Sequence, residues 1–216
     1  MNVQNENKQE TGYYKIAGII LFISALQYLL AVNLAETQFP GYSIANNTLS
    51  TLGGSIPLVE PSAIIFNVSV ILFGILGLAT VYLILKSGGS RIFSVCLAIS
   101  SAGAIGVGLF PQYTGNTHLL FALVTFLFGS LATLFSYRLN LNIPMIIVSL
   151  VMGLMSFILV LLLIILGSGD ANPFIAYLGI GGNERFVAYP IIIYLAALGG
   201  YLTSRGQDNV KTKPTE

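Results

Sequence analysis

Six long apolar segments dominate the sequence, and their length restricts the possible folds more than any other feature. They lie at residues 15–34, 62–85, 92–110, 117–137, 143–166 and 184–204. Each is close to the roughly 20 residues that an α-helix needs to cross a hydrocarbon core about 30 Å thick. Within lipid, backbone N–H and C=O groups must bond to each other, and a helix satisfies them inside one segment. The sequence therefore predicts an all-α polytopic membrane protein, a bundle of six transmembrane helices.

The composition excludes several classes of protein. Charged residues make up 8% of the chain, whereas a soluble domain carries about 25%. The net charge of +1 is too small for a nucleic-acid surface, which needs many Lys and Arg contacts to phosphate. Cys96 is the single cysteine and lies in an apolar run, so no disulfide framework and no cysteine metal cluster is expected. We expect membrane lipid as the main partner, another membrane protein as a further one, and neither a metal ion nor a cofactor.

The basic residues predict the orientation of the spans. Cytoplasmic connections of membrane proteins are enriched in Lys and Arg. With both termini on one side, that side holds every cation except Arg185, namely Lys8, Lys15, Lys86, Arg91, Arg138, Arg205, Lys211 and Lys213. We therefore expect a multi-pass protein of the cell membrane with both termini in the cytoplasm. Its parts are a cytoplasmic tail at 1–14, the six-helix domain at 15–204 and a second cytoplasmic tail at 205–216.

Arg185, at the start of the last span in "GIGGNERFVAYP", opposes these rules. We expect Asn183 to cap that helix and Glu184 to lie in its first turn, where the helix dipole favours an anion. A cation at the same place is unfavourable near lipid unless it is paired. Arg185 should therefore have a carboxylate partner, hold a bound anion or reach water at the interface. The candidate carboxylates are Glu184, Asp170 and Glu60.

Further polar residues are expected at the same outer depth. Asn67 lies about 9 Å into the second span, at about 1.5 Å per residue from Pro61. His118 falls in the first turn of the fourth span, which Asn116 can cap. The cluster predicted at the outer face therefore consists of Asn67, His118, Glu184 and Arg185. The loop "NNTLSTLGG" is long enough to fold over it.

Within the spans, other residues suggest how the helices pack. Gln27 and Asn33 are expected to donate hydrogen bonds between helices, and Pro190 to bend or break the first turns of the last one. Small residues recur every four positions and predict close helix contacts. These are Ser94, Ala98, Ala102 and Gly106 in the third span and Ala196, Gly200 and Ser204 in the sixth.

Four stretches of the chain carry a resemblance to a known family. They are "LSTLGG", "FNVSVILFG", "GLFPQYTGNTHLLFALVTFLFG" and "GGNERFVAYP". On these, nearly the whole chain resembles the prokaryotic six-span membrane proteins grouped as domain of unknown function 998. In many members the first motif reads Ser-Asp-Leu-Gly, and Thr51 stands where that Asp would be, which weakens any catalytic role built on it. The resemblance implies the six-span topology and a shared site for the polar positions, and no activity.

Two classes of function remain open at this point. In the first, the outer polar cluster binds a lipid, a small anion or a partner protein without catalysis. A transporter is a variant of this class, but few ionisable residues lie at the membrane midplane, where coupling sites are usual. In the second, a membrane-embedded hydrolase or transferase uses His118 as acid or base with Glu184 as its carboxylate partner. The single histidine and the lack of a serine nucleophile motif favour binding.

Overall fold

The computed structural model describes residues 3–169 and 171–211, and the side chains of residues 12–169 and 171–204. Within these residues every regular element is helical. The long helices are α1 (Val3–Thr37), α3 (Ser62–Lys86), α4 (Arg91–Leu109), α5 (Asn116–Phe135), α6 (Ile143–Leu166) and α7 (Pro173–Lys211). The short elements are α2 (Thr51–Gly54) and the 3₁₀ turns η1 (Gln112–Thr114) and η2 (Ser136–Leu139).

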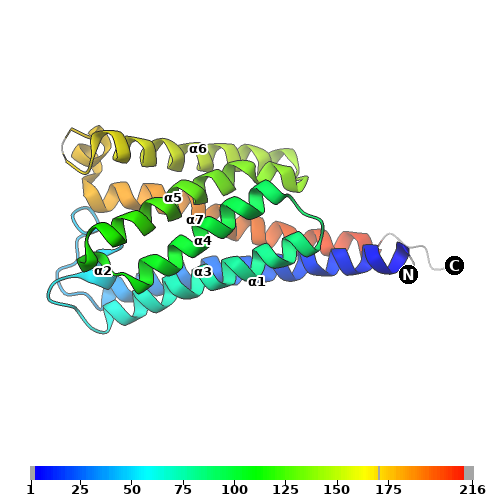
Figure 1. Cartoon of the computed structure of the whole chain (residues 1–216), viewed down its shortest axis with the longest axis horizontal. Helices are drawn as coiled ribbons and strands as arrows, with labels where there is room; N and C mark the ends of the chain where they lie inside the picture. Colours follow the sequence, from blue (N-terminus) through cyan, green and yellow to red (C-terminus); the bar gives the residue numbers. More distant parts are fainter. Residues whose placement is uncertain (1–2, 170, 212–216) are drawn as a thin grey trace.

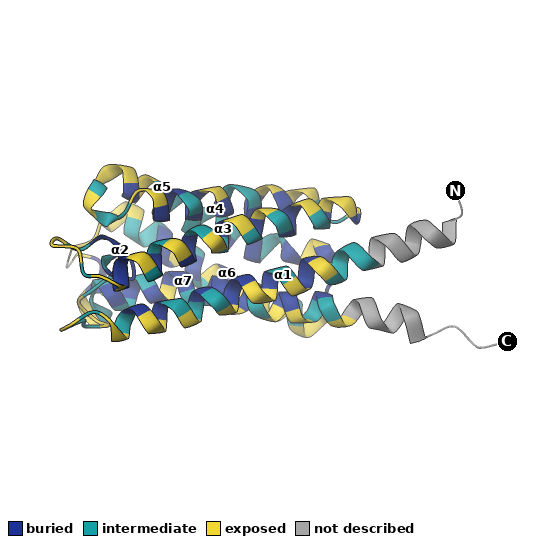
Figure 2. Ribbon diagram, turned by 90° about the horizontal axis from the view of Figure 1, so that it is seen from below, coloured by how far each residue is buried: buried dark blue, intermediate teal, exposed yellow. Residues whose placement is uncertain are grey.

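The six long helices confirm the predicted bundle, because each contains a stretch long and apolar enough to cross a membrane. Large apolar side chains such as Leu30 and Ile165 are 70% and 73% exposed on the outside of the bundle. Figure 2 shows that buried residues face the interior and exposed residues face outward along each helix. An apolar exterior of this kind is suited to lipid.

The helices form a closed ring. Neighbouring pairs pack in the order α1, α3, α4, α5, α7 and back to α1, and α6 packs outside this ring against α5 and α7 (Figure 1). The connections after α1, α4 and α6 lie together at one end, called here the loop end. Helix α1 begins and α7 ends at the opposite, terminal end.

Helix α7 begins earlier than the sequence suggests. The side chain of Asn172 caps it by accepting a hydrogen bond from Phe174 N at 3.1 Å, and Pro173 occupies the first helical position, where its missing N–H has no cost. The predictions that Asn183 caps this helix and that it starts at 184 are therefore wrong. The helix breaks at Gly179, whose φ of 74° and ψ of 165° are non-helical, and not at Pro190.

Two polar side chains of α1 behave differently. The amide of Gln27 donates to the carbonyl of Ser69 on α3 at 3.1 Å, which confirms the predicted bond between helices. Asn33 is exposed and donates to Leu29 O of its own helix at 2.8 Å. For Asn33 the prediction is wrong, because its face of α1 points away from the bundle.

The small-residue contacts are confirmed only in part, since Ser94 and Gly106 are buried and a Cβ at Gly106 would collide with the Phe121 ring. Ala102 and Gly200 are exposed, so the two predicted stripes do not form continuous seams. The close contact of α1 and α7 is at Gly18 and Gly199, where an added Cβ on either residue would meet the backbone of the other helix. The four-residue spacing in the sequence selected Gly200, whereas the structure places the adjacent Gly199 at the contact.

On α5, the residue before the helix is Gly115, and Asn116 is the first helical residue. The cap predicted at Asn116 is therefore displaced by one position. No side chain caps this helix start in the structure.

Candidate functional site

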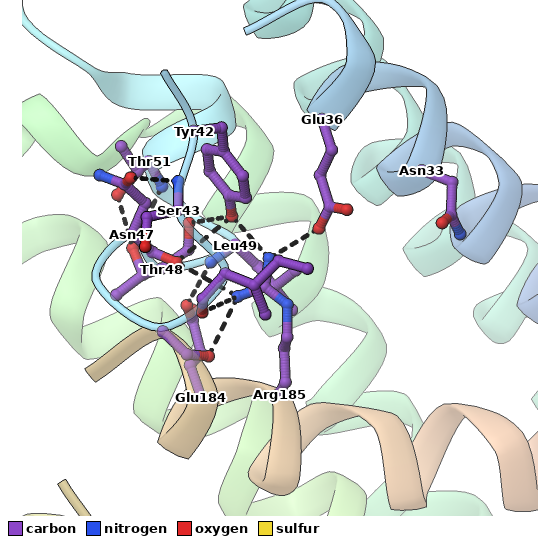
Figure 3. Close-up of polar contacts among 12 residues, drawn as sticks. Asn33, Glu36, Tyr42, Ser43, Asn47, Thr48, Leu49, Thr51, Glu184 and Arg185 are labelled. Carbon is purple, nitrogen blue, oxygen red and sulfur yellow. Dashed lines mark hydrogen bonds and ion pairs between the residues drawn. The ribbon is translucent and has the colours of Figure 1, made fainter. Parts of the chain in front are cut away.

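Arg185 is the centre of a dense polar cluster at the loop end (Figure 3). Its Nη2 donates to Glu36 Oε1 at 2.6 Å and to the hydroxyl of Tyr42 at 2.7 Å. Its Nη1 donates to the backbone carbonyls of Ile44, Asn47 and Gly181 at 3.1, 3.2 and 3.1 Å. The guanidinium joins the end of α1, the following loop and α7, and we call this set of contacts the arginine clamp.

Tyr42 extends the clamp into the loop. Its ring lies under the guanidinium, with 5.5 Å between Arg185 Cζ and the ring centroid, and its hydroxyl donates to Thr48 O at 2.8 Å. Burial raises the pKa of the Tyr42 phenol to about 12, against the lowering effect of Arg185. The phenol therefore remains a neutral donor, and it links Arg185 to the loop backbone by accepting from Nη2 and donating to Thr48 O.

Two glycines of α7 let the loop lie directly on the helix. Gly181 N donates to Ala45 O at 2.9 Å. A Cβ at Gly181 would collide with the carbonyl oxygens of Asn47 and Ile44, and one at Gly179 with that of Ala45. The positive φ of Gly179 is also a conformation that other residues rarely adopt. The "GIGG" stretch is thus the surface of α7 on which the loop packs, and we call it the loop seat.

Glu184 does not take part in the clamp. Its Oε2 accepts from Leu49 N at 2.6 Å and its Oε1 from the Ser50 hydroxyl at 3.0 Å. Among the described side chains it forms no salt bridge, because the neighbouring Arg185 pairs with Glu36 instead. Its carboxylate is held by loop donors and faces inward.

Below Glu184 lies a cavity enclosed by the ring of helices. Its lining comes from α1, α3, α4, α5 and α7, with Leu49 and Ser50 of the loop at one end. The lining is mainly apolar, and its polar members include Tyr28, Ser24 and Glu184. About 50 Å³ of the cavity admits the centre of a water molecule.

Asn67 contacts the same loop at a second point. Its Nδ2 donates to Gly53 O at 2.9 Å, and its Oδ1 is buried without a hydrogen-bond partner in the described structure. A Cβ at Gly53 would collide with Asn67 and Phe66. The predicted folding of "NNTLSTLGG" over Asn67, Glu184 and Arg185 is therefore confirmed, since all three side chains contact residues of this loop.

His118 is separate from the other predicted site residues. It is 7% exposed, and its Nδ1 donates to Phe110 O at 2.8 Å, which closes the turn between α4 and α5. It does not line the cavity, and no hydrogen bond joins it to Glu184 in the described part of the chain. The structure therefore does not assemble the acid–base pair of His118 and Glu184 that the catalytic alternative requires.

The partner of Arg185 is not among the three carboxylates considered from the sequence. Glu60 accepts from Ile64 N at 3.2 Å at the start of α3, Glu184 binds the loop, and Asp170 lies outside the described residues. The sequence signal that points to Glu36 is its place at the outer end of the first span, at the same depth as Arg185. Tyr42 carried no comparable signal.

A metal site is not formed by the described side chains. In residues 12–169 and 171–204, no group of three or more His, Cys, Asp or Glu lies close enough to hold an ion. Most polar side chains of the loop end are instead bonded to each other or to backbone, and Asn67 Oδ1 and Asn183 Oδ1 are buried without a partner among the described residues.

Comparison with known proteins adds a family and no activity. No curated protein and no solved structure matches the chain. The sequence model of a family described as "protein of unknown function (DUF998)" matches residues 22–201, from the first helix to the last. The matched region includes the arginine clamp, Glu184 and every lining residue of the cavity except Leu21. The chain belongs to the DUF998 family of proteins of unknown function.

Proposed function

We propose that this integral membrane protein binds one hydrocarbon chain of an amphipathic molecule in the cavity inside its helix ring, beneath the clamped loop. The observation that carries this proposal is the length of the cavity lining along two helices. Lining residues on α7 run from Glu184 to Leu195, a rise of about 16 Å at about 1.5 Å per residue. On α3 they run from Phe66 to Gly77, which is a similar length.

The width also suits a single chain. Spread over about 16 Å, the 50 Å³ open to water centres gives a passage about 1 Å in radius for those centres. Adding about 1.4 Å for the radius of a water molecule gives a mean bore radius of roughly 2.4 Å. Contacts between carbon atoms are about 3.5–4.0 Å long, and half of this distance is the radius of a carbon atom. A hydrocarbon chain therefore needs a bore radius of about 2 Å.

The walls favour hydrocarbon over water. The hydroxyls of Ser24, Ser100 and Thr125 donate to backbone carbonyls at 3.1, 2.8 and 2.8 Å, so they offer little polarity to the cavity. A buried water needs two to four polar partners, and apolar cavities remain dry. A bilayer supplies hydrocarbon chains at high concentration, and each buried methylene stabilises a complex by about 0.8 kcal/mol relative to water.

Other functions have less support. A small anion bound at the Nη atoms of Arg185 would have to displace Glu36, Tyr42 or backbone carbonyls, because both of these atoms are already bonded. An enzyme based on His118 and Glu184 would need the two side chains to meet, and they bond to different loops. Binding without catalysis therefore agrees best with the geometry.

The chain has no tryptophan, which allows a direct test. Phe126→Trp places a single fluorescent reporter in the cavity wall, and Phe22→Trp places one on α1 at a position 40% exposed on the outside. Both variants are reconstituted in lipid nanodiscs and titrated with dodecanol brominated along its chain, which quenches tryptophan on contact. We expect saturable quenching of the cavity reporter at a low mole fraction, where the outer reporter is quenched only weakly and linearly.

A variant that fills the cavity and a control variant outside it complete this experiment. Ala104 is fully buried and lines the cavity, so Ala104→Phe in the Phe126→Trp background should fill the passage and abolish saturable quenching. Ala31→Phe, on the same background but outside the cavity lining, should leave it intact. Equal, linear quenching of the cavity and outer reporters would contradict the proposal.

A further inference from the structure

We infer that the chain held in this cavity ends, at Glu184, in a hydrogen-bond donor such as a hydroxyl or an ammonium group, and not in a phosphate or carboxylate. This inference rests on the proposed function, since it concerns the polar end of the same ligand. It begins from the position of Glu184, which lines the loop end of the passage while the rest of the passage is largely apolar.

Glu184 retains capacity to accept hydrogen bonds. An ionised carboxylate accepts about four, and hydrogen bonds from Leu49 N and Ser50 Oγ occupy one position on each oxygen. Tyr28 lines the same cavity from α1, and its phenol makes no hydrogen bond with another described residue. A hydroxyl or ammonium at this point would find a charged acceptor and a phenol together.

The surrounding charges exclude an anionic end. The nearest basic side chain, Arg185, directs its guanidinium to Glu36 and the loop carbonyls. A phosphate beside Glu184 would therefore face carboxyl oxygens that already act as acceptors and a guanidinium bonded elsewhere, in a site where apolar walls reduce screening. A cationic or hydroxyl end would instead supply the partner that Glu184 lacks.

The apolar composition of the rest of the wall determines which way the ligand is oriented in the cavity. Glu184 lies at the loop end, and the lining continues toward Leu21, Leu97 and Leu195 near the middle of the bundle. A polar end can be satisfied only at the loop end, so the chain must extend from Glu184 toward the terminal end. This places the donor near the membrane interface and the hydrocarbon in the core.

The test compares end groups on one chain. Dodecanol, dodecylamine, dodecyl phosphate and dodecane, all brominated along the chain, are titrated against the Phe126→Trp protein in nanodiscs at neutral pH. We expect the alcohol and the amine to bind at least about ten-fold more tightly than the phosphate, which corresponds to about 1.4 kcal/mol. The alcohol should bind more tightly than dodecane, which has no donor.

Glu184→Gln separates charge from hydrogen bonding. Glutamine keeps one acceptor oxygen, so the amine should lose about ten-fold in affinity and the alcohol less than about three-fold. Glu60→Gln is the matched control, because Glu60 is exposed at the same end and does not line the cavity. If Glu184→Gln does not fold, the comparison of end groups in the otherwise unaltered protein decides the question alone.

The outcomes separate this inference from the proposed function. Equal affinities for alcohol, amine and phosphate, or tightest binding of the phosphate, would overturn the inference and leave chain binding in place. Absence of saturable quenching by any of the four compounds, dodecane included, would overturn the proposed function itself.

Discussion

Replacing Arg185 with alanine should destabilise the loop end more than any other single substitution of a basic residue with described contacts. The change leaves the Glu36 carboxylate without its cation and removes one side-chain donor from each of three backbone carbonyls. Removing one partner of a buried ion pair costs about 3–5 kcal/mol. Because the side chains of Arg185 and Glu36 are 8% and 19% exposed, water reaches the pair in part, and we take the lower value of about 3 kcal/mol.

That loss converts to a measurable shift in the melting temperature. For a domain of this size, 1 kcal/mol corresponds to about 2–4 °C, so Arg185→Ala should melt about 6–12 °C below wild type. Unfolding of membrane proteins in detergent is often irreversible, so apparent Tm values must be compared at one scan rate. Arg138→Ala is the control, because Arg138 is exposed and contacts only Tyr137 among the described residues, and should change Tm by less than about 2 °C.

Conservative variants test which part of the clamp matters. Arg185→Lys should fall between wild type and Arg185→Ala, because one ammonium cannot reach the acceptors of both Nη atoms. Glu36→Gln keeps an acceptor but loses the charge, and should cost about 1 kcal/mol. The double variant Arg185→Ala with Glu36→Ala should be less destabilised than the sum of the two single variants. If Arg185→Ala melts within about 2 °C of wild type, the clamp does not hold the loop and the reasoning is refuted.

Three further predictions concern the loop seat, its pH response and the topology. Gly181→Ala should cost about 2 kcal/mol, because its Cβ meets loop carbonyls, whereas Gly200→Ala, where a Cβ has open space, should be neutral or stabilising in the same thermal assay. A folded-state pKa of about 12 against 10 for a free phenol means that the folded protein keeps the Tyr42 proton longer than the unfolded chain, so stability should fall between pH 10 and pH 12. Tyr42→Phe should reduce that fall in apparent Tm, and an unchanged profile would contradict the role of the phenol. A membrane-impermeant maleimide should label Tyr113→Cys, at the loop end, on intact cells and should label Arg91→Cys, at the terminal end, only after lysis; the reverse pattern would invert the predicted orientation.

The helices were predictable because lipid requires a long apolar run and a closed backbone hydrogen-bond ladder. The exception is the start of α7, where "PFIAYL" is helical although it follows a polar stretch and precedes glycines. Its start signal is the pair of Asn172 as cap and Pro173 at the first helical position. Gly179 then ends the local run, and the helix resumes beyond it, so the break is a property of one residue.

The site was only partly predictable. The position of each residue along its predicted span placed Asn67, Glu184 and Arg185 at one end, and the loop does cover them. Position along a span contains no information on the order of the helices around the bundle. Arg185 meets Glu36 because α1 and α7 are neighbours in the ring, and no local pattern states that. His118 has the right depth as well, yet its bond to Phe110 O holds it in the turn between α4 and α5.

Glu184 and Arg185 would be taken as an ion pair from their adjacency, yet adjacent helical residues point about 100° apart. The Arg185 side chain binds Glu36 on α1 and Tyr42 in the loop, and the Glu184 side chain lines the cavity. Because Arg185 pairs with Glu36, the carboxyl of Glu184 forms no salt bridge with a described side chain. An arginine paired with Glu184 would instead release the loop, whose carbonyls Arg185 holds. The pairing of Arg185 with Glu36 therefore keeps Arg185 bonded to the loop and, under the proposed function, leaves the Glu184 oxygens open to a donor on the ligand.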